Sequence, residues 1–226
     1  PSGQPIERQL RLSGPVVELA GATLTAPAEL REQFPEVFAR IAAQLGAPVM
    51  DGAKLQIIAE GAEAAQAGVA WSSLPAEAFG IRIDAGARRV TVHAASSAGA
   101  LQGLYRLLAL AIANDNTIRS GELLDWPAHA IRAMHITTRD ITPRMMKWVV
   151  DQASVAGFNT LIVQYSDSVR FAARAVPPRD NAMSKQQFLT AIDYARQSGM
   201  RVIPEVKLLS HQEKFFGAAY PELMYN

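Results

Sequence analysis

The second half of the chain follows a strand–helix–strand–helix–strand pattern, which restricts the possible folds more than any other feature of the sequence. The predicted strands cover residues 131–136, 159–165 and 201–206. Helices are predicted to begin after Thr142, which precedes a proline, and after Ser184, which stands three residues before a glutamine; both arrangements are helix N-cap signatures. Because such units pair their strands in parallel with the helices as crossovers, the pattern predicts a parallel sheet.

Two parallel architectures compete for this half. A doubly wound nucleotide-binding fold would have a glycine-rich turn after its first strand, whereas residues 137–140 read Thr-Thr-Arg-Asp. The alternative is the first part of a (β/α)8 TIM barrel, whose chemistry gathers where strands end. Polar residues do follow each predicted strand: Thr137, Arg139, Asp140, Ser166, Asp167, Arg170, Glu205, Lys207, Ser210 and His211. The barrel is therefore favoured, and it is incomplete, because residues 126–226 are fewer than half of the ~250 that such a barrel needs.

The first half has a different pattern and is predicted to be a separate, noncatalytic α+β domain over residues 1–125. Segments 79–84 and 89–94 form a predicted antiparallel hairpin, and 35–45 is a predicted amphipathic helix. Ser96 or its neighbour caps a further predicted helix. The fold class is thus α+β followed by α/β, with residues 126–226 as the partial catalytic barrel.

Charge and composition exclude several classes of function. The chain has 22 basic and 21 acidic residues, a formal net charge of +1, so it lacks the basic surplus typical of nucleic-acid or anionic-membrane binding. No apolar run approaches the ~20 residues that span a bilayer. The absence of cysteine excludes disulfides, thiolate nucleophiles and cysteine-ligated metals.

The candidate site residues each have a structural and a functional interpretation. Glu205 directly follows a proline on an apolar strand, and a carboxylate there must be paired or solvated, so function is favoured. For Asp167 and His211 a loop role and a catalytic role stay equally open. Asp140 stands before a helix, where it stabilises the helix dipole or serves the site. His135 lies inside a strand, which favours a core position with a satisfied imidazole.

Two catalytic constellations are conceivable but weakly supported. His135, Glu205 and His211 would supply the three ligands of a catalytic zinc, but they lack a short ligand-spacing motif. Ser166, His211 and Asp167 would form a nucleophilic triad, but Ser166 lacks the Gly-x-Ser-x-Gly elbow. We therefore expect no metal and no cofactor.

Three segments resemble the catalytic barrel of glycoside hydrolase family 20, the β-N-acetylhexosaminidases. The first is Asp-Trp-Pro at 125–127, followed by Ile-Arg-Ala-Met-His-Ile at 131–136. The second is Asn-Thr-Leu-Ile-Val-Gln-Tyr-Ser-Asp at 159–167. The third is Val-Ile-Pro-Glu-Val at 202–206, with His211 six residues after the glutamate. Upstream, residues 90–103 are similar to the family's noncatalytic α+β domain, so the resemblance covers about residues 30 to 215.

The resemblance implies roles for four residues. Arg132 matches an arginine that holds sugar hydroxyls, a role suited to a planar, permanently charged donor, and Glu205 belongs to the third-strand motif beside the sugar. Asp167 and His211 match a polar network beside the general acid. The chain also departs from the family pattern at several positions: Ala133 replaces glycine, Thr137 aspartate, Gln164 histidine, Lys207 aspartate, and Leu209-Ser210 Pro-Gly.

The family hydrolyses its substrate with retention, assisted by the substrate's own acetamido group, outside the usual two-carboxylate rule. Its adjacent Asp-Glu pair, which orients the acetamido group and protonates the leaving oxygen, follows the fourth barrel strand. No adjacent Asp-Glu occurs in the 226 residues, so we expect the pair beyond Asn226 and no activity from this chain alone.

The expected partner is a sugar or glycan, with self-association or the missing remainder of the barrel covering the open sheet edge. The family implies a periplasmic or extracellular location. Two alternatives stay open: a noncatalytic glycan-binding or assembly module, and a related O-linked N-acetylglucosaminidase or α-glucuronidase.

Overall fold

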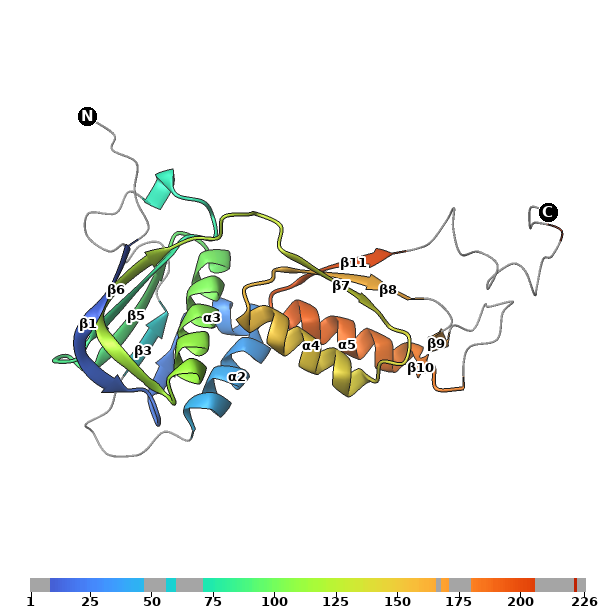
Figure 1. Cartoon of the computed structure of the whole chain (residues 1–226), viewed down its shortest axis with the longest axis horizontal. Coiled ribbons are helices and arrows are strands. Elements are labelled where there is room, and N and C mark those ends of the chain that lie inside the picture. Colours follow the sequence, from blue (N-terminus) through green and yellow to red (C-terminus); the bar gives the residue numbers. More distant parts are fainter. Residues whose placement is uncertain are drawn as a thin grey trace. The chain divides into compact units, whose positions relative to one another are not determined.

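The structure is a computed structural model that describes residues 9–46, 56–59, 71–165, 168–170, 180–205 and 222. The chain divides into two compact units, coloured blue to green and yellow to red in Figure 1. The first comprises Pro1–Ala130 with the short segments Ser154–Gly157 and Gln197–Gly199, and the second comprises the remaining residues. No helix among the described residues is long and apolar enough to cross a membrane.

The first unit is built on a six-stranded mixed sheet in the order β1-β6-β4-β5-β3-β2. The outer pair β1–β6 and the pairs β6–β4 and β4–β5 are antiparallel, whereas β5–β3 and β3–β2 are parallel. The predicted hairpin is confirmed as β4 and β5, with Phe79 opposite Ala94. The strands are β1 (Gln9–Glu18), β2 (Thr23–Thr25), β3 (Gln56–Ala59), β4 (Phe79–Asp84), β5 (Arg89–Ala94) and β6 (Thr117–Asp125).

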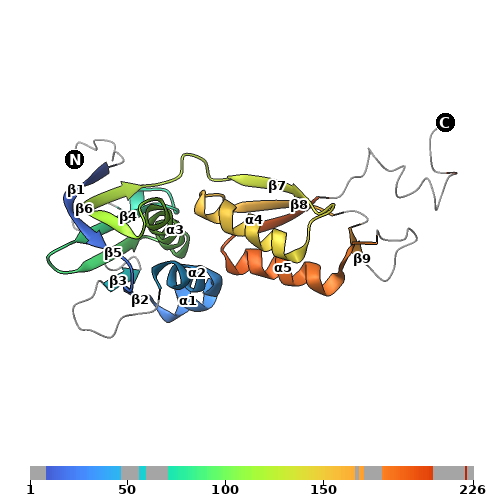
Figure 2. The same cartoon turned by 60° about the horizontal axis from the view of Figure 1, so that its bottom comes forward.

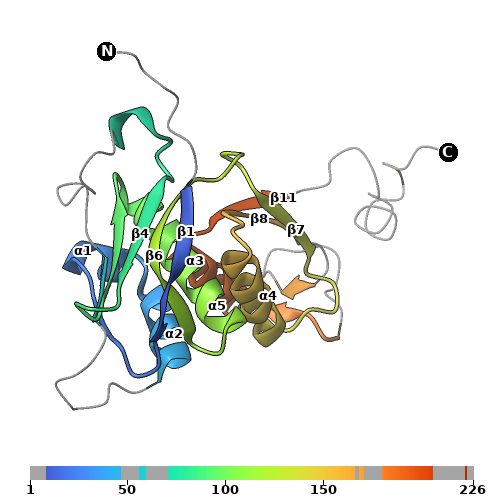
Figure 3. The ribbon, with the colours of Figure 1, turned by 60° about the vertical axis from the view of Figure 1, so that its left-hand side comes forward.

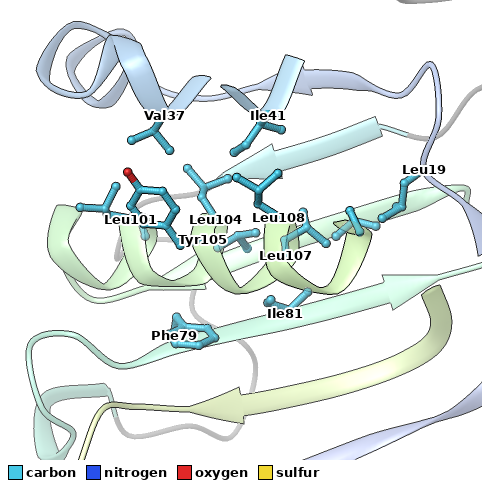
Figure 4. Close-up of a cluster of buried hydrophobic side chains, with 14 of the residues drawn as sticks. Leu19, Val37, Ile41, Phe79, Ile81, Leu101, Leu104, Tyr105, Leu107 and Leu108 are labelled. Carbon is cyan, nitrogen blue, oxygen red and sulfur yellow. The ribbon is translucent and has the colours of Figure 1, made fainter. Parts of the chain in front are cut away.

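Helices α1 (Ala28–Gln33), α2 (Pro35–Leu45) and α3 (Ser97–Ala113) and a short 3-10 turn at Trp71–Ser73 complete this unit. Figure 4 shows the side chains of α3 packed between Val37 and Ile41 of α2 and the strand β4. The close approach of α3 to the sheet requires glycine at 103, because a Cβ there would lie 2.5 Å from Val92 Cγ1. The Ser96 cap is confirmed, since its Oγ accepts a hydrogen bond from Gly99 N at 3.1 Å.

The second unit contains the predicted parallel sheet. Strands β7 (Ala133–Thr137), β8 (Thr160–Gln164) and β11 (Arg201–Glu205) lie side by side in the order β7-β8-β11 (Figure 3). Both strand pairs are parallel, so the predicted strand–helix–strand–helix–strand pattern is confirmed. The crossovers contain α4 (Pro143–Val155) and α5 (Lys185–Gln197), and β9 (Val169–Arg170) pairs in parallel with β10 (Met183–Ser184).

Helices α4 and α5 cover the same face of this sheet (Figure 2). Met146 and Val150 of α4 are fully buried in a core that α5 and the sheet share. Tyr194 of α5 donates a hydrogen bond from its hydroxyl to Asp151 Oδ1 of α4 at 2.6 Å, which joins the two helices. This packing assigns one face of β7, β8 and β11 to the core.

The two predicted helix starts in this unit are confirmed at the atomic level. Thr142 Oγ1 accepts a hydrogen bond from Met145 N at 3.2 Å. Ser184 and Gln187 form a reciprocal capping box: Ser184 N donates to Gln187 Oε1 at 2.8 Å, and Gln187 N donates to Ser184 Oγ at 3.1 Å. These bonds satisfy backbone N–H groups that lack an intrahelical partner.

Candidate functional site

The face of the parallel sheet opposite α4 and α5 is exposed in the part of the chain that the structure describes. On β7, Ile136 is buried among the helices, whereas the alternate residues His135 and Thr137 are exposed. On β11, Ile203 is 39% exposed. Because successive side chains on a strand point to opposite faces, His135 and Thr137 of β7 and Glu205 of β11 share this face.

A row of three polar side chains crosses the carboxyl end of this face. Thr137, Gln164 and Glu205 are direct register partners on β7, β8 and β11. Neighbouring strands lie about 4.8 Å apart, so the row presents a hydroxyl, an amide and a carboxylate in line. Such a row suits a neutral ligand that is rich in hydroxyl groups.

The residue after β7 keeps the row in place. Thr138 is 1% exposed, and its backbone N donates a hydrogen bond to the Gln164 carbonyl at 3.0 Å. Its Oγ1 donates to the same carbonyl at 3.3 Å. The end of β7 is therefore attached to the end of β8 by two bonds.

An ion pair connects the two outer strands across this row. His135 Nε2 lies 2.6 Å from Glu205 Oε2, and their side chains are 50% and 34% exposed. The pair reaches over β8, since β7 and β11 are not neighbours. His135 thus has a partner, as expected, but the predicted core position is wrong, because the alternation of β7 directs this residue away from α4.

Arg132 lies at the other end of the sheet from Glu205. Asn159 holds its backbone on both sides: Asn159 Oδ1 accepts from Arg132 N, and Asn159 N donates to Arg132 O, both at 3.0 Å. Thr137, which shares the row with Glu205, lies five positions after Arg132, about 16 Å along a strand. The backbone of Arg132 therefore lies at the opposite end of the sheet from that of Glu205.

Several loop residues at the carboxyl end have structural partners. Asp140 has a left-handed backbone conformation, with φ of 62°, and its Oδ1 accepts a hydrogen bond from Asn181 Nδ2 at 3.1 Å. Arg170 donates from Nε to the Ala182 carbonyl at 3.1 Å and from Nη2 to the Asp180 carbonyl at 2.6 Å. These contacts tie the loop after β7 and strand β9 to the segment before β10.

The predicted supporting residues Asp167 and His211 lie outside the described residues, as do Ser166, Lys207 and Ser210. Their roles stay predictions. Within the described ranges, no group of three or more His, Asp or Glu side chains is arranged to hold a metal ion. Of the three hypothetical zinc ligands, His135 and Glu205 are in contact, and the third, His211, lies outside the described residues.

Comparison of the sequence with known proteins finds no relative. No family model matches it, and no curated protein matches it. Comparison of the structure gives a different result. The chain is similar to the β-N-acetylhexosaminidase of Bacteroides fragilis, with a TM-score of 0.70 and 18% identity over 94% of this chain. It is also similar to the family 20 β-N-acetylhexosaminidase of Streptomyces coelicolor, with a TM-score of 0.69 and 19% identity over 96% of this chain.

The chain has the fold of glycoside hydrolase family 20. A chitobiase of Flavobacterium johnsoniae shares it, with a TM-score of 0.66 and 16% identity over 94% of this chain. The chain spans 35%, 46% and 48% of the lengths of the Flavobacterium, Bacteroides and Streptomyces proteins, which is less than half of each. The family 20 fold thus accounts for nearly the whole of this chain and for part of each similar structure.

Proposed function

We propose that this chain is part of a glycoside hydrolase, specifically a retaining β-N-acetylhexosaminidase that uses substrate-assisted catalysis. The observation that carries the proposal is the family 20 fold, which extends over both units of the chain. We propose further that β7, β8 and β11 are the first three strands of a (β/α)8 barrel. Their parallel pairing in chain order, with a helix in each crossover, supports this arrangement.

In the proposed site, an N-acetylhexosamine lies over the polar row at the carboxyl end of the sheet. The Glu205 carboxylate accepts a hydrogen bond from a sugar hydroxyl, and Thr137 and Gln164 supply neutral donors and acceptors beside it. The position of the row supports this assignment, because barrel enzymes bind their substrates at the carboxyl ends of the strands. Arg132, which directly precedes β7, stays a proposed sugar-binding residue on the basis of its motif position.

The chemistry itself requires groups that these residues do not supply. The substrate's acetamido oxygen attacks C1, a carboxylic acid protonates the leaving oxygen, and a second carboxylate orients the acetamido group, so that the leaving group departs with a proton. Because the 226 residues contain no adjacent Asp-Glu, we assign that pair to residues outside this sequence. Asp167 and His211 are proposed to support the acid on the basis of their motif positions. The proposed location, periplasmic or extracellular, rests on the family alone.

Saccharide binding tests the proposed site directly. Titration of the 226-residue chain with N-acetylglucosamine should change the NMR chemical shifts of Thr137, Gln164 and Glu205. Glu205→Gln should weaken binding about tenfold, as expected for loss of a hydrogen bond to a charged group. Glu122→Gln is the matched control, because Glu122 forms an exposed ion pair with Arg82 in the other unit. An unperturbed polar row would contradict the proposal.

Hydrolysis tests the activity. We expect the full product of the gene to hydrolyse an aryl N-acetyl-β-glucosaminide, and the 226-residue chain to show no turnover. Turnover by the short chain that Asp167→Ala or His211→Ala abolishes would require a different acid and would overturn the assignment of the catalytic pair.

The alternative function is a noncatalytic glycan-binding or assembly module. The polar row of Thr137, Gln164 and Glu205 fits saccharide binding with or without hydrolysis. Saccharide binding at Glu205 without hydrolysis by the full gene product would select this alternative over the hydrolase.

A further inference from the structure

The His135–Glu205 pair has an unusual position for an ion pair on a sheet. Its partners stand on strands that are not neighbours, about 9.6 Å apart at the usual strand spacing, with β8 between them. Both side chains lie on the face opposite the helices, and the distance between Nε2 and Oε2 is only 2.6 Å. The contact therefore forms above the central strand, on the face that carries the polar row.

Solvent exposure limits what this pair contributes to folding. With 50% of the imidazole side chain and 34% of the glutamate side chain exposed, water screens the attraction, and exposed pairs stabilise proteins little. The fixed geometry matters more for ligand binding. A glutamate has three side-chain torsions, and it loses rotamer freedom when a ligand immobilises it. A partner that holds the carboxylate beforehand reduces this loss on binding.

The contact with His135 engages one of the two carboxylate oxygens of Glu205, Oε2. Among the residues that the structure describes, none forms a hydrogen bond with the other oxygen, Oε1. Thr137 and Gln164 stand beside Glu205 in the same row. A carboxylate whose one oxygen is held presents the other as a directed acceptor for a hydroxyl group.

We propose that His135 is a positioning residue, which holds Oε2 of Glu205 so that Oε1 accepts a hydrogen bond from a hydroxyl of a bound neutral saccharide. This inference rests on the proposed function, since it concerns the same site. It assigns a role to a residue that is not part of the polar row and belongs to a different strand from Glu205.

The test is a double-mutant cycle on the 226-residue chain, with N-acetylglucosamine as the probe. His135→Leu removes the donor, and His135→Gln keeps an amide donor near the position of Nε2. We expect His135→Leu to weaken binding about five- to tenfold, His135→Gln to stay within about twofold, and His135→Leu to have no further effect in a Glu205→Gln background. Glu122→Gln, which alters the exposed pair of the other unit, should leave the affinity unchanged.

A spectroscopic readout separates positioning from general damage to the fold. In a long-range ¹H–¹⁵N spectrum, the His135 ring nitrogens should shift in Glu205→Gln and stay in place in Glu122→Gln. Three results would overturn the inference. The first is an unchanged affinity in His135→Leu, and the second is an equal loss of affinity from His135→Leu in the wild-type and Glu205→Gln backgrounds. The third is a His135 ring-nitrogen signal that does not shift in Glu205→Gln. If His135→Leu does not fold, the imidazole signal and His135→Gln decide the question. If the wild-type protein binds no saccharide, the proposed function is overturned. If it binds saccharide with an affinity that substitution of His135 does not change, only this inference is overturned.

Discussion

The two sheets differ in how deeply their central strands are buried. In the first unit, the central strand β5 is buried on both faces, and even its polar Thr91 and His93 are 8% and 9% exposed. In the second unit, the central strand β8 buries Leu161 and Val163, whereas Ile162 and Gln164 on its other face are only partly buried, and Ile203 of the outer strand β11 is 39% exposed. The middle of the first sheet is thus more deeply buried than the second sheet, although the side chains of Arg82 of β4 and Glu122 of β6 remain exposed. In the second unit, one face carries the packing and the other carries polar groups, so stability and the proposed binding should be separable there by mutation.

The largest effect is expected in the centre of the first core. Leu104 of α3 is fully buried, and Leu104→Ala should lower the free energy of unfolding by about 2–5 kcal/mol, because it leaves a cavity that its neighbours cannot fill. Ile112→Ala, on the same helix but 49% exposed, is the control and should cost under about 1 kcal/mol. Urea denaturation measures both, and equal losses would contradict the assigned core.

Two adjacent methionines test the division of roles in the second unit. Met146 is fully buried under the sheet, and Met145 is 50% exposed. Met146→Ala should cost about 2–4 kcal/mol, whereas Met145→Ala should stay within about 0.5 kcal/mol. Amide hydrogen exchange of β7 and β8 reports this unit separately, and a larger loss for Met145→Ala would reverse the assigned face of α4.

A smaller effect is expected at the start of α5. Ser184→Ala removes one half of the capping box and should cost about 1 kcal/mol. Lys185→Ala, which alters an exposed neighbour in the first turn, serves as the control. Exchange rates at the start of α5 measure the effect, and equal rates in both variants would show that the box is dispensable.

The smallest effect on stability is expected at the site. Glu205→Gln removes a half-exposed ion pair and should change the free energy of unfolding by about 0.2–1 kcal/mol, while it weakens saccharide binding. Urea denaturation and the NMR titration measure the two quantities on the same sample. A loss of several kcal/mol would show that the exposed face also stabilises the fold.

Local signals in the sequence predicted much of this architecture. The caps at Ser96, Thr142 and Ser184 could be predicted from the sequence because capping depends on residues within one helical turn. The parallel sheet was readable because its strands alternate with helices in chain order. In contrast, strand β6 was not predicted. Its Gly121 has φ of 143° and interrupts the apolar alternation, so pairing with β1 and β4 determines its conformation.

The site was predicted only in part for a similar reason. Glu205 stood out because a carboxylate at the end of an apolar strand requires a partner. The identity of that partner depends on lateral strand order, which places β8 between His135 and Glu205. Arg132 was chosen from its motif, and only the strand bounds show that it precedes β7 and lies at the amino end of the sheet.

The pairing of β1 with β6 has a consequence for synthesis on the ribosome. Leu10 is the register partner of Leu123. More than a hundred further residues must therefore be synthesised after β1 before its partner strand is present. Each strand of the three-stranded parallel sheet, by comparison, pairs with the next strand of that sheet across a connection that contains one helix. Loop closure over a long segment slows folding, and an unpaired strand edge promotes association between chains. The outer strand pair of the first sheet therefore completes only after β6 has been synthesised, whereas the parallel sheet can add one strand at a time along the chain.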